Sequence, residues 1–256
     1  MHMKNHDSAV FLLGGHDLEM MEIRRILESY KIAFFDNNLT WDTAHLSAYS
    51  NIFSDRPNAH YYGVELKEDC LKPLYYTRID HHNDYSDREA SILQVASLLE
   101  IEPDHRLELV AANDARYIPG MLELGASRCE IDVIRRQDRA AQGVSEEDER
   151  NAELSITRSL SIHGDLQVVY SLTPCFSPIC DRLYPYHRLL IYTDDVWSFY
   201  GEGKTELVRS FDDLISQGKL YHGGGDKGYI GSCRGAFSAN EILEFVNKIQ
   251  QRYEHV

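Results

Sequence analysis

The chain has 256 residues, 43% of them hydrophobic, which is enough for one large domain or two ordinary ones, each with a packed core. It carries 26 basic and 41 acidic residues, a formal net charge of -15, and this balance argues against coating long duplex nucleic acid, whose phosphates attract basic surfaces. Every apolar run is short and soon interrupted by charge, so no segment is expected to span a bilayer.

The cysteines and the N-terminus set an expectation about the compartment. The cysteines are odd in number and fit no zinc-finger spacing; they are Cys70, Cys129, Cys175, Cys180 and Cys233. A redox pair or zinc site at the closest two is the alternative to ordinary thiols in a reducing compartment. Residues 1–7 lack the apolar core and cleavage site of a secretory signal. We therefore expect a cytoplasmic protein.

The first half of the chain alternates strand-like and helix-like segments. The predicted strands are 8–13, 32–35, 59–66 and 74–79, and the predicted helices are 17–30, 43–49, 88–99 and 105–112. Such alternation predicts an α/β domain with a mostly parallel sheet and helices on both faces.

The second half begins afresh after a strongly charged stretch, residues 137–160. Its predicted strands are 166–172, 189–192 and 196–200, and its predicted helices are 206–216 and 239–253. We therefore expect an N-terminal domain over residues 1–140, a helical connector over 141–164, and a smaller α/β C-terminal domain over 165–256.

Polar side chains follow the predicted strands of the first half. Ligands of parallel sheets gather outside the carboxyl ends of the strands. His16 and Asp17 follow the first strand, Glu65 ends the third, and Asp80-His81-His82 follows the fourth. Two imidazoles and a carboxylate suit manganese or zinc. Because adjacent side chains diverge, one histidine can bind a metal while the other faces a phosphate; the alternative is a solvated polar loop.

Each of the other candidates also has a structural interpretation. Asp17 can cap a helix with Glu19 in its first turn, Glu65 can face solvent at a strand end, and Asp114 can end a helix before the turn at 119–120. Taken together, however, clusters of carboxylates and imidazoles at successive elements match the needs of a two-metal site.

This pattern resembles the DHH phosphoesterase family, whose namesake Asp-His-His stands here as Asp80-His81-His82. The resemblance covers nearly the whole chain and implies an N-terminal domain that binds two divalent cations, usually Mn²⁺, and a C-terminal domain with a glycine-rich loop. The metal ligands that it implies are His16, Asp17, Glu19, Glu65, His81 and Asp114. His82 would contact the phosphate or protonate the leaving oxygen, and Asp80 would orient a histidine.

The glycine-rich loop of the second half is similar to the substrate-binding loop of that family. Its implied substrate-binding residues are His222, Gly223, Gly224, Gly225, Asp226 and Lys227. Exposed backbone amides there can bind an anion, whereas the alternative is a flexible turn between a strand and a helix. The chain departs from the family pattern at Glu19 and Glu65, where aspartates are usual, and at Asp226, where a histidine is usual.

These features predict a metal-dependent hydrolase of a phosphodiester or phosphoanhydride bond. The expected substrate is a small phosphorylated molecule, a nucleotide or short oligonucleotide, with no long duplex and no membrane as partner. Bound divalent cations would supply the positive charge that the acidic chain lacks. Two alternatives stay open: a non-catalytic nucleotide- or metal-binding protein on the same scaffold, and an unrelated α/β enzyme with an incidental histidine pair.

Overall fold

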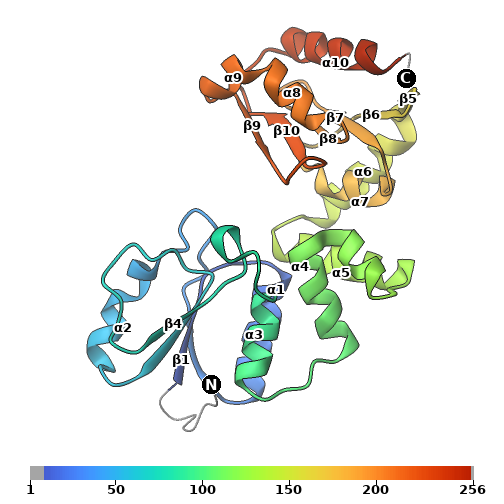
Figure 1. Cartoon of the computed structure of the whole chain (residues 1–256). Helices are drawn as coiled ribbons and strands as arrows, with labels where there is room; N and C mark the ends of the chain where they lie inside the picture. The colour runs from blue at the N-terminus through green and yellow to red at the C-terminus, as the bar shows by residue number, and fades with distance from the viewer. Residues whose placement is uncertain (1–8, 255–256) are drawn as a thin grey trace. The chain divides into compact units, whose positions relative to one another are not determined.

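The computed structural model describes residues 9–254, and the chain divides into two compact units between Gly143 and Val144. Both units are mixtures of strands and helices (Figure 1). We describe each unit by itself.

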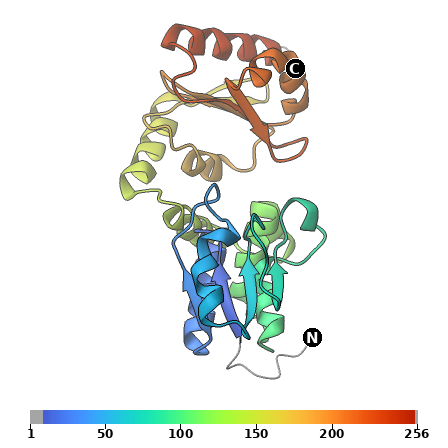
Figure 2. The same ribbon diagram turned by 90° about the vertical axis from the view of Figure 1, so that its left-hand side faces the viewer.

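The first unit contains a four-stranded, fully parallel sheet (Figure 2). Its strands lie in the order β2-β1-β3-β4, with bounds β1 (Ala9–Leu13), β2 (Ala33–Asp36), β3 (His60–Val64) and β4 (Tyr76–Ile79). β1 is buried along its whole length, as expected of a central strand with covered faces. The predicted parallel sheet is therefore confirmed.

Helices cover both faces of this sheet, as predicted (Figure 1). On one side lie α1 (Leu18–Ser29), α3 (Ser91–Leu98), α4 (His105–Glu123) and α5 (Arg128–Ala141). On the other side, η2 (Leu46–Tyr49) and α2 (Ser50–Asp55) pack on the sheet. Val10 and Leu12 point to that side and meet Leu46, Tyr49 and Ile52 there, which fixes the register of β1.

Two local predictions in this unit need correction. The helix expected over 43–49 is a short 3-10 turn at 46–49 that runs on into α2, because Leu46, Tyr49 and Ile52 share one buried face. α4 continues past residue 112 and breaks only at Tyr117 (φ 57°, ψ -149°), directly before Ile118 and Pro119. Asp114 therefore lies inside α4 and does not end it.

The second unit is built on a six-stranded mixed sheet in the order β5-β6-β7-β8-β10-β9. The strands are β5 (Ser161–His163), β6 (Leu166–Tyr170), β7 (Arg188–Tyr192), β8 (Trp197–Gly201), β9 (Leu220–Gly223) and β10 (Tyr229–Ser232). One face packs under α8 (Lys204–Ser210), α9 (Asp212–Ser216) and α10 (Ala239–Tyr253), and the other meets α6 (Glu146–Ser159) and α7 (Ser177–Leu183).

Helix α10 matches its predicted bounds, with Ser238 and Glu241 forming a reciprocal cap at its start. The segment expected as a connector contains α6, whose Ala152 is buried in the core beneath β6 and α7, so this helix belongs to the second unit. The helix expected over 206–216 is interrupted at Phe211, which is buried against Trp197 and Phe245.

None of the helices formed by residues 9–254 has the length and apolar character needed to cross a bilayer.

Candidate metal centre

The candidate site lies at the edge of the parallel sheet where the strands have their carboxyl ends. It is at the topological switch point between β1 and β3, because β2 is added on one side of β1, and β3 and β4 on the other. Gly14 follows β1 and is essential to this edge: a Cβ there would lie 2.5 Å from the carbonyl oxygens of both Val64 and Glu65. Glu65 follows β3 in a left-handed conformation (φ 54°), while its backbone N–H donates to the Ile79 carbonyl at 2.8 Å. Such strain in a residue other than glycine is typical of functional sites.

The loop after β4 is held by Asp80, which is buried. Its Oδ2 accepts from Nε and Nη2 of Arg78 at 2.9 and 2.5 Å, and its Oδ1 accepts from the backbone N–H of His82 at 2.9 Å. Asp80 thus fixes the backbone that carries the two histidines rather than either ring.

The two histidine rings converge, contrary to the expectation that adjacent side chains diverge. Their centroids lie 4.1 Å apart. The reason is local: His82 is extended (φ -96°, ψ 155°) and its N–H is tied to Asp80, while Asn83 turns the chain with φ 51°. Both imidazoles consequently open into the same space.

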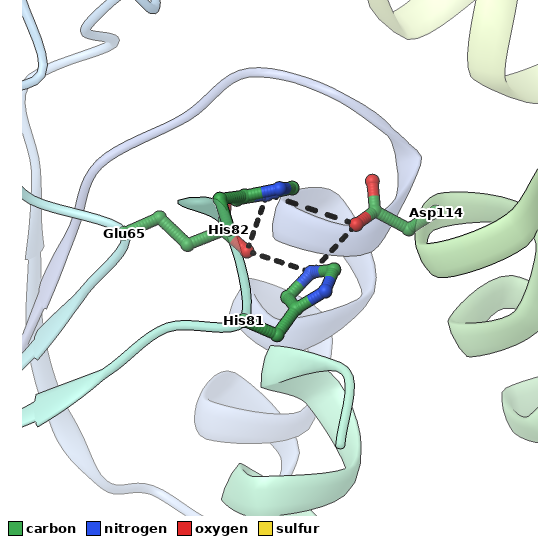
Figure 3. Close-up of side chains that lie close together, drawn as sticks. All are labelled: Glu65, His81, His82 and Asp114. Atoms are coloured by element: carbon green, nitrogen blue, oxygen red, sulfur yellow. Dashed lines mark ion pairs between the residues drawn. The ribbon is translucent and has the colours of Figure 1, made fainter. Parts of the chain in front are cut away.

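Four side chains, from the loops that follow β3 and β4 and from α4, meet in that space (Figure 3). One ligand atom from each of Glu65, His81, His82 and Asp114 lies within 4.8 Å of all the others. His81 Nε2 is 2.7 Å from Asp114 Oδ2 and 3.4 Å from Glu65 Oε1. His82 Nε2 lies 3.4 Å from Glu65 Oε1 and 3.8 Å from Asp114 Oδ2.

Glu19 adds a third carboxylate to this cluster. It is buried in the first turn of α1, its Oε1 accepts from the Ile92 N–H at 3.0 Å, and its Oε2 lies 3.5 Å from His81 Nε2. Asp17 is also buried, and it caps α1 by accepting from the Met20 N–H at 2.8 Å. The structural interpretation of Asp17 therefore holds, whatever further role it has.

His16 stands apart from the cluster. Its side chain is exposed and lines a separate hollow of about 670 Å³ beside α1, together with Asp36 and Arg106. The structure thus brings together five of the predicted residues, Glu19, Glu65, His81, His82 and Asp114, and leaves His16 outside.

The buried polar atoms of the cluster lack well-aligned hydrogen-bond partners within the described residues. They are Glu19 Oε2, both carboxylate oxygens of Glu65, Asp114 Oδ2 and the Nε2 atoms of His81 and His82. Buried polar atoms normally have hydrogen-bond partners, so six such atoms that face one space without them indicate a ligand site. Imidazoles with carboxylates form a donor set that fits manganese or zinc.

The electrostatics point the same way. Burial opposes a charge on His81, yet the adjoining carboxylates of Asp114, Glu19 and Glu65 raise its pKa to about 12. Burial raises the pKa of Glu19 well above its ordinary value, whereas the two imidazoles hold the pKa of Glu65 below its own against burial. Burial, with the charges of Asp114 and Glu65, raises the pKa of Asp17 to about 7. A concentration of carboxylates thus keeps a cationic imidazole among them, as it would a metal cation.

Two pockets adjoin the cluster, and the sequence analysis predicted only some of the residues that line them. One, of about 550 Å³, is bordered by Arg88 and Arg116 as well as by His81, His82 and Asp114. The other, of about 290 Å³, is lined by Trp41, Ala44, Glu65, Lys67, Arg78, Asp80, His82 and Asn83. The proximity of Arg78 to Asp80 and of Lys67 to Glu65 in the sequence could have indicated these two cations, whereas no sequence motif singled out Trp41.

The glycine-rich loop of the second unit is a hairpin between β9 and β10, not a turn between a strand and a helix. Gly228 has to be glycine, because a Cβ there would lie 2.0 Å from the Gly223 carbonyl oxygen. Lys227 Nζ pairs with Glu202 at 2.9 Å, and Asp226 accepts from the Thr205 hydroxyl at 3.3 Å. His222 is exposed on β9.

Comparisons with known proteins identify the fold. No family profile matches the sequence, and no curated protein sequence is similar to it. Among solved structures, the chain is similar to the pGpG-specific phosphodiesterase PggH from Vibrio cholerae, with a TM-score of 0.52 and 12% identity, over 96% of this chain and 98% of that one.

Two further structures are matched more loosely. A DHH domain from a member of the s1p family of ribosomal proteins gives a TM-score of 0.44 at 12% identity, covering 91% of this chain and 73% of that one. RecJ from Thermus thermophilus in complex with Mn²⁺ gives a TM-score of 0.40 at 9% identity, covering 97% of this chain and 52% of that one. The predicted resemblance is confirmed at the level of the fold.

Proposed function

We infer that this chain, a divergent member of the DHH phosphoesterase family by its fold and its Asp80-His81-His82 sequence, is a metal-dependent phosphoesterase. The observation that carries the proposal is the buried cluster of imidazole and carboxylate atoms without hydrogen-bond partners among the described residues. A hydrolase needs such a cluster at an accessible edge, and hollows of about 550 and 290 Å³ adjoin this one.

Divalent cations would be held by Glu19, Glu65, His81 and Asp114, with Asp17 close enough to contribute its charge. Neither oxygen of Glu65 has a hydrogen-bond partner within residues 9–254, so both are available to hold a divalent cation, for which we propose Mn²⁺. When bound, such ions lower the pKa of a water to near neutrality and offset charge that develops on the phosphate.

The two histidines differ in a way that supports separate roles. The His81 side chain is 4% exposed and lies 2.7 Å from Asp114, whereas that of His82 is 36% exposed and lies 3.8 Å from the same carboxylate. We assign His81 to the metal, and His82 to the phosphate or to proton donation at the leaving oxygen. Asp80 positions His82 through its backbone N–H, and Arg78 holds Asp80 in place.

A small nucleotide-like substrate fits best. The acidic chain disfavours a long polymer, and PggH, whose fold is similar, is described as specific for pGpG. In the second unit, the glycine hairpin would bind substrate through backbone amides and through His222, Gly223, Gly224, Gly225, Asp226 and Lys227. The chemistry needs no long-range contact with nucleic acid.

A non-catalytic binding protein is the second candidate. His16 lies outside the cluster, so the ligand set has one imidazole fewer than the family resemblance implies. Tight binding of metal and nucleotide without product, under any divalent cation, would favour this candidate.

The test is to purify the chain without chelator, measure bound metal, and follow hydrolysis of a generic phosphodiester with and without Mn²⁺. We expect bound metal and Mn²⁺-dependent turnover in the wild type, and loss of both in His81→Ala. A matched control is His105→Ala, an exposed histidine on α4 outside the cluster. Full turnover in His81→Ala would overturn the site assignment.

A further inference from the structure

The indole of Trp41 lies at the edge of the metal centre although nothing in the proposed chemistry uses it. It is 43% exposed, and its ring meets the His82 ring edge-on, with centroids 5.6 Å apart and an interplanar angle of 84°. Its six-membered ring lies against Gly15, where a Cβ would be 3.1 Å from Cη2. An exposed tryptophan held against two neighbours offers its free surface to a ligand.

The loop that carries Trp41 is well fixed. The Thr43 N–H donates to the Thr40 carbonyl at 2.8 Å, and the Thr40 N–H donates to the Thr43 hydroxyl at 2.9 Å, which closes a turn around Trp41. Ala44 follows and is buried. The exposure of Trp41 is therefore built into the fold and is not that of a loose loop end.

Lys67 is fastened next to this turn by backbone hydrogen bonds. Its N–H donates to the Ala44 carbonyl at 2.8 Å, and its carbonyl accepts from the Leu46 N–H at 2.9 Å. Its side chain is exposed, and its ammonium forms no ion pair within residues 9–254. The other cation that lines the same hollow, Arg78, is bound to Asp80. Lys67 thus supplies a positive charge that no carboxylate of the described chain neutralises.

We propose that Trp41 and Lys67 form the nucleotide-recognition subsite of this centre, with the indole stacking on a base and the ammonium binding a phosphate next to the scissile one. The proposal rests on the proposed function, because it is the neighbouring phosphoesterase chemistry that calls for a nucleotide in this hollow. Both side chains line the same pocket of about 290 Å³, which lies near the lower end of the range for small-molecule sites, so we expect it to take a single nucleotide unit. Every base has a π-face, so stacking would supply affinity with little sequence preference.

The test follows the fluorescence of the full chain in Mg²⁺, a cation that does not itself quench, during titration with guanosine 5′-monophosphate, guanosine and ribose 5-phosphate. The chain has only two tryptophans, and Trp197 is fully buried in the second unit, so a contact quencher reports on Trp41. We expect saturable quenching by the two guanosine compounds and none by ribose 5-phosphate. Quenching by ribose 5-phosphate alone, or none at all, would overturn the proposal.

Two variants, measured by calorimetry, separate the two contacts. Trp41→Leu should weaken the affinity for guanosine 5′-monophosphate about tenfold and leave the affinity for ribose 5-phosphate unchanged. Lys67→Met should weaken the affinities for guanosine 5′-monophosphate and ribose 5-phosphate and leave the affinity for guanosine unchanged. Matched controls are Tyr30→Leu, another exposed aromatic side chain, and Lys72→Met, which is paired with Glu68. Unchanged affinities in Trp41→Leu and Lys67→Met would refute the subsite.

These readouts do not need turnover, so they separate this proposal from the proposed function. Saturable quenching in a protein that hydrolyses nothing would reject the phosphoesterase and keep the subsite. Mn²⁺-dependent hydrolysis, with wild-type nucleotide affinity in both variants, would reject the subsite and keep the phosphoesterase.

Discussion

The metal cluster of the first unit and the glycine hairpin of the second unit were both found as sequence motifs, yet their polar groups are in opposite states. In the cluster, six buried atoms face one space without well-aligned partners within the described residues. In the hairpin, exposed side chains already have partners: Lys227 with Glu202, and Asp226 with Thr205. The cluster is therefore built to receive a ligand, whereas the hairpin has to give up contacts before its side chains can bind one.

Because of this difference, we expect ligand binding at the cluster to be more favourable in free energy than ligand binding at the hairpin. Burying several carboxylates with only the adjacent imidazoles to offset their charge is costly, so a metal that enters the cluster relieves an existing penalty. An exposed pair such as Lys227 with Glu202 is screened by water and contributes little to stability, so its exchange for a substrate contact changes little. Substitutions in the cluster should accordingly have far larger effects than those in the hairpin.

The largest effect is expected from Glu65→Gln, which keeps the shape of the side chain and removes its charge. Metal-dependent turnover should fall by at least about a thousandfold, because bound ions contribute several kcal/mol to such reactions. Steady-state kinetics over a Mn²⁺ titration, with bound metal measured in parallel, checks this. Glu68→Gln, a nearby carboxylate outside the cluster, is the matched control. Wild-type metal content and turnover in Glu65→Gln would contradict the expectation that substitutions in the cluster have the larger effects.

His82→Asn should have the next largest effect. If His82 serves the phosphate and not the metal, kcat should fall by about a hundredfold or more, the usual contribution of a positioned acid, while bound metal stays near wild type. His81→Asn should lose the metal as well. Loss of metal in both variants would instead show that the two histidines share one role, as their facing rings permit.

Much of this site followed from sequence, and what did not has a physical reason. Parallel strands end at one edge, so placing Glu65 and the Asp80-His81-His82 segment after successive strands predicted that they meet. The direction of a side chain in a loop depends on φ and ψ, which residue types do not fix. His16, after two glycines, faces outward, while Asn83 and Asp80 turn both histidines inward.

The residues that were missed depend on contacts between distant segments. Lys67 reaches the edge of the site because its backbone pairs with Ala44 and Leu46. Trp41 is placed by a short turn and by contact with Gly15. No sequence motif singles out Trp41, and only the assembled fold brings both side chains beside His82.

A divalent cation should stabilise the first unit by about 2.7 kcal/mol at a hundredfold excess over its dissociation constant. Hydrogen exchange followed by mass spectrometry should slow in α1, α3 and β4 and stay unchanged in β8 and α10. The effect should grow from pH 6 to pH 8, because binding displaces the proton of His81, whose pKa is raised to about 12. Equal protection of both units, or protection that persists in His81→Ala, would contradict a cation held in this cluster.

The smallest effect is expected in the hairpin, from Asp226→Asn. The amide still accepts from the Thr205 hydroxyl, so only the negative charge is lost. If the hairpin faces a substrate phosphate, KM for an anionic dinucleotide should fall by a few-fold at low salt. The difference should fade as salt is added, because exposed charges are screened. Asp194→Asn, an exposed aspartate away from the hairpin, is the matched control. An unchanged KM at low salt would indicate that this loop does not meet the phosphate, leaving substrate recognition to the first unit.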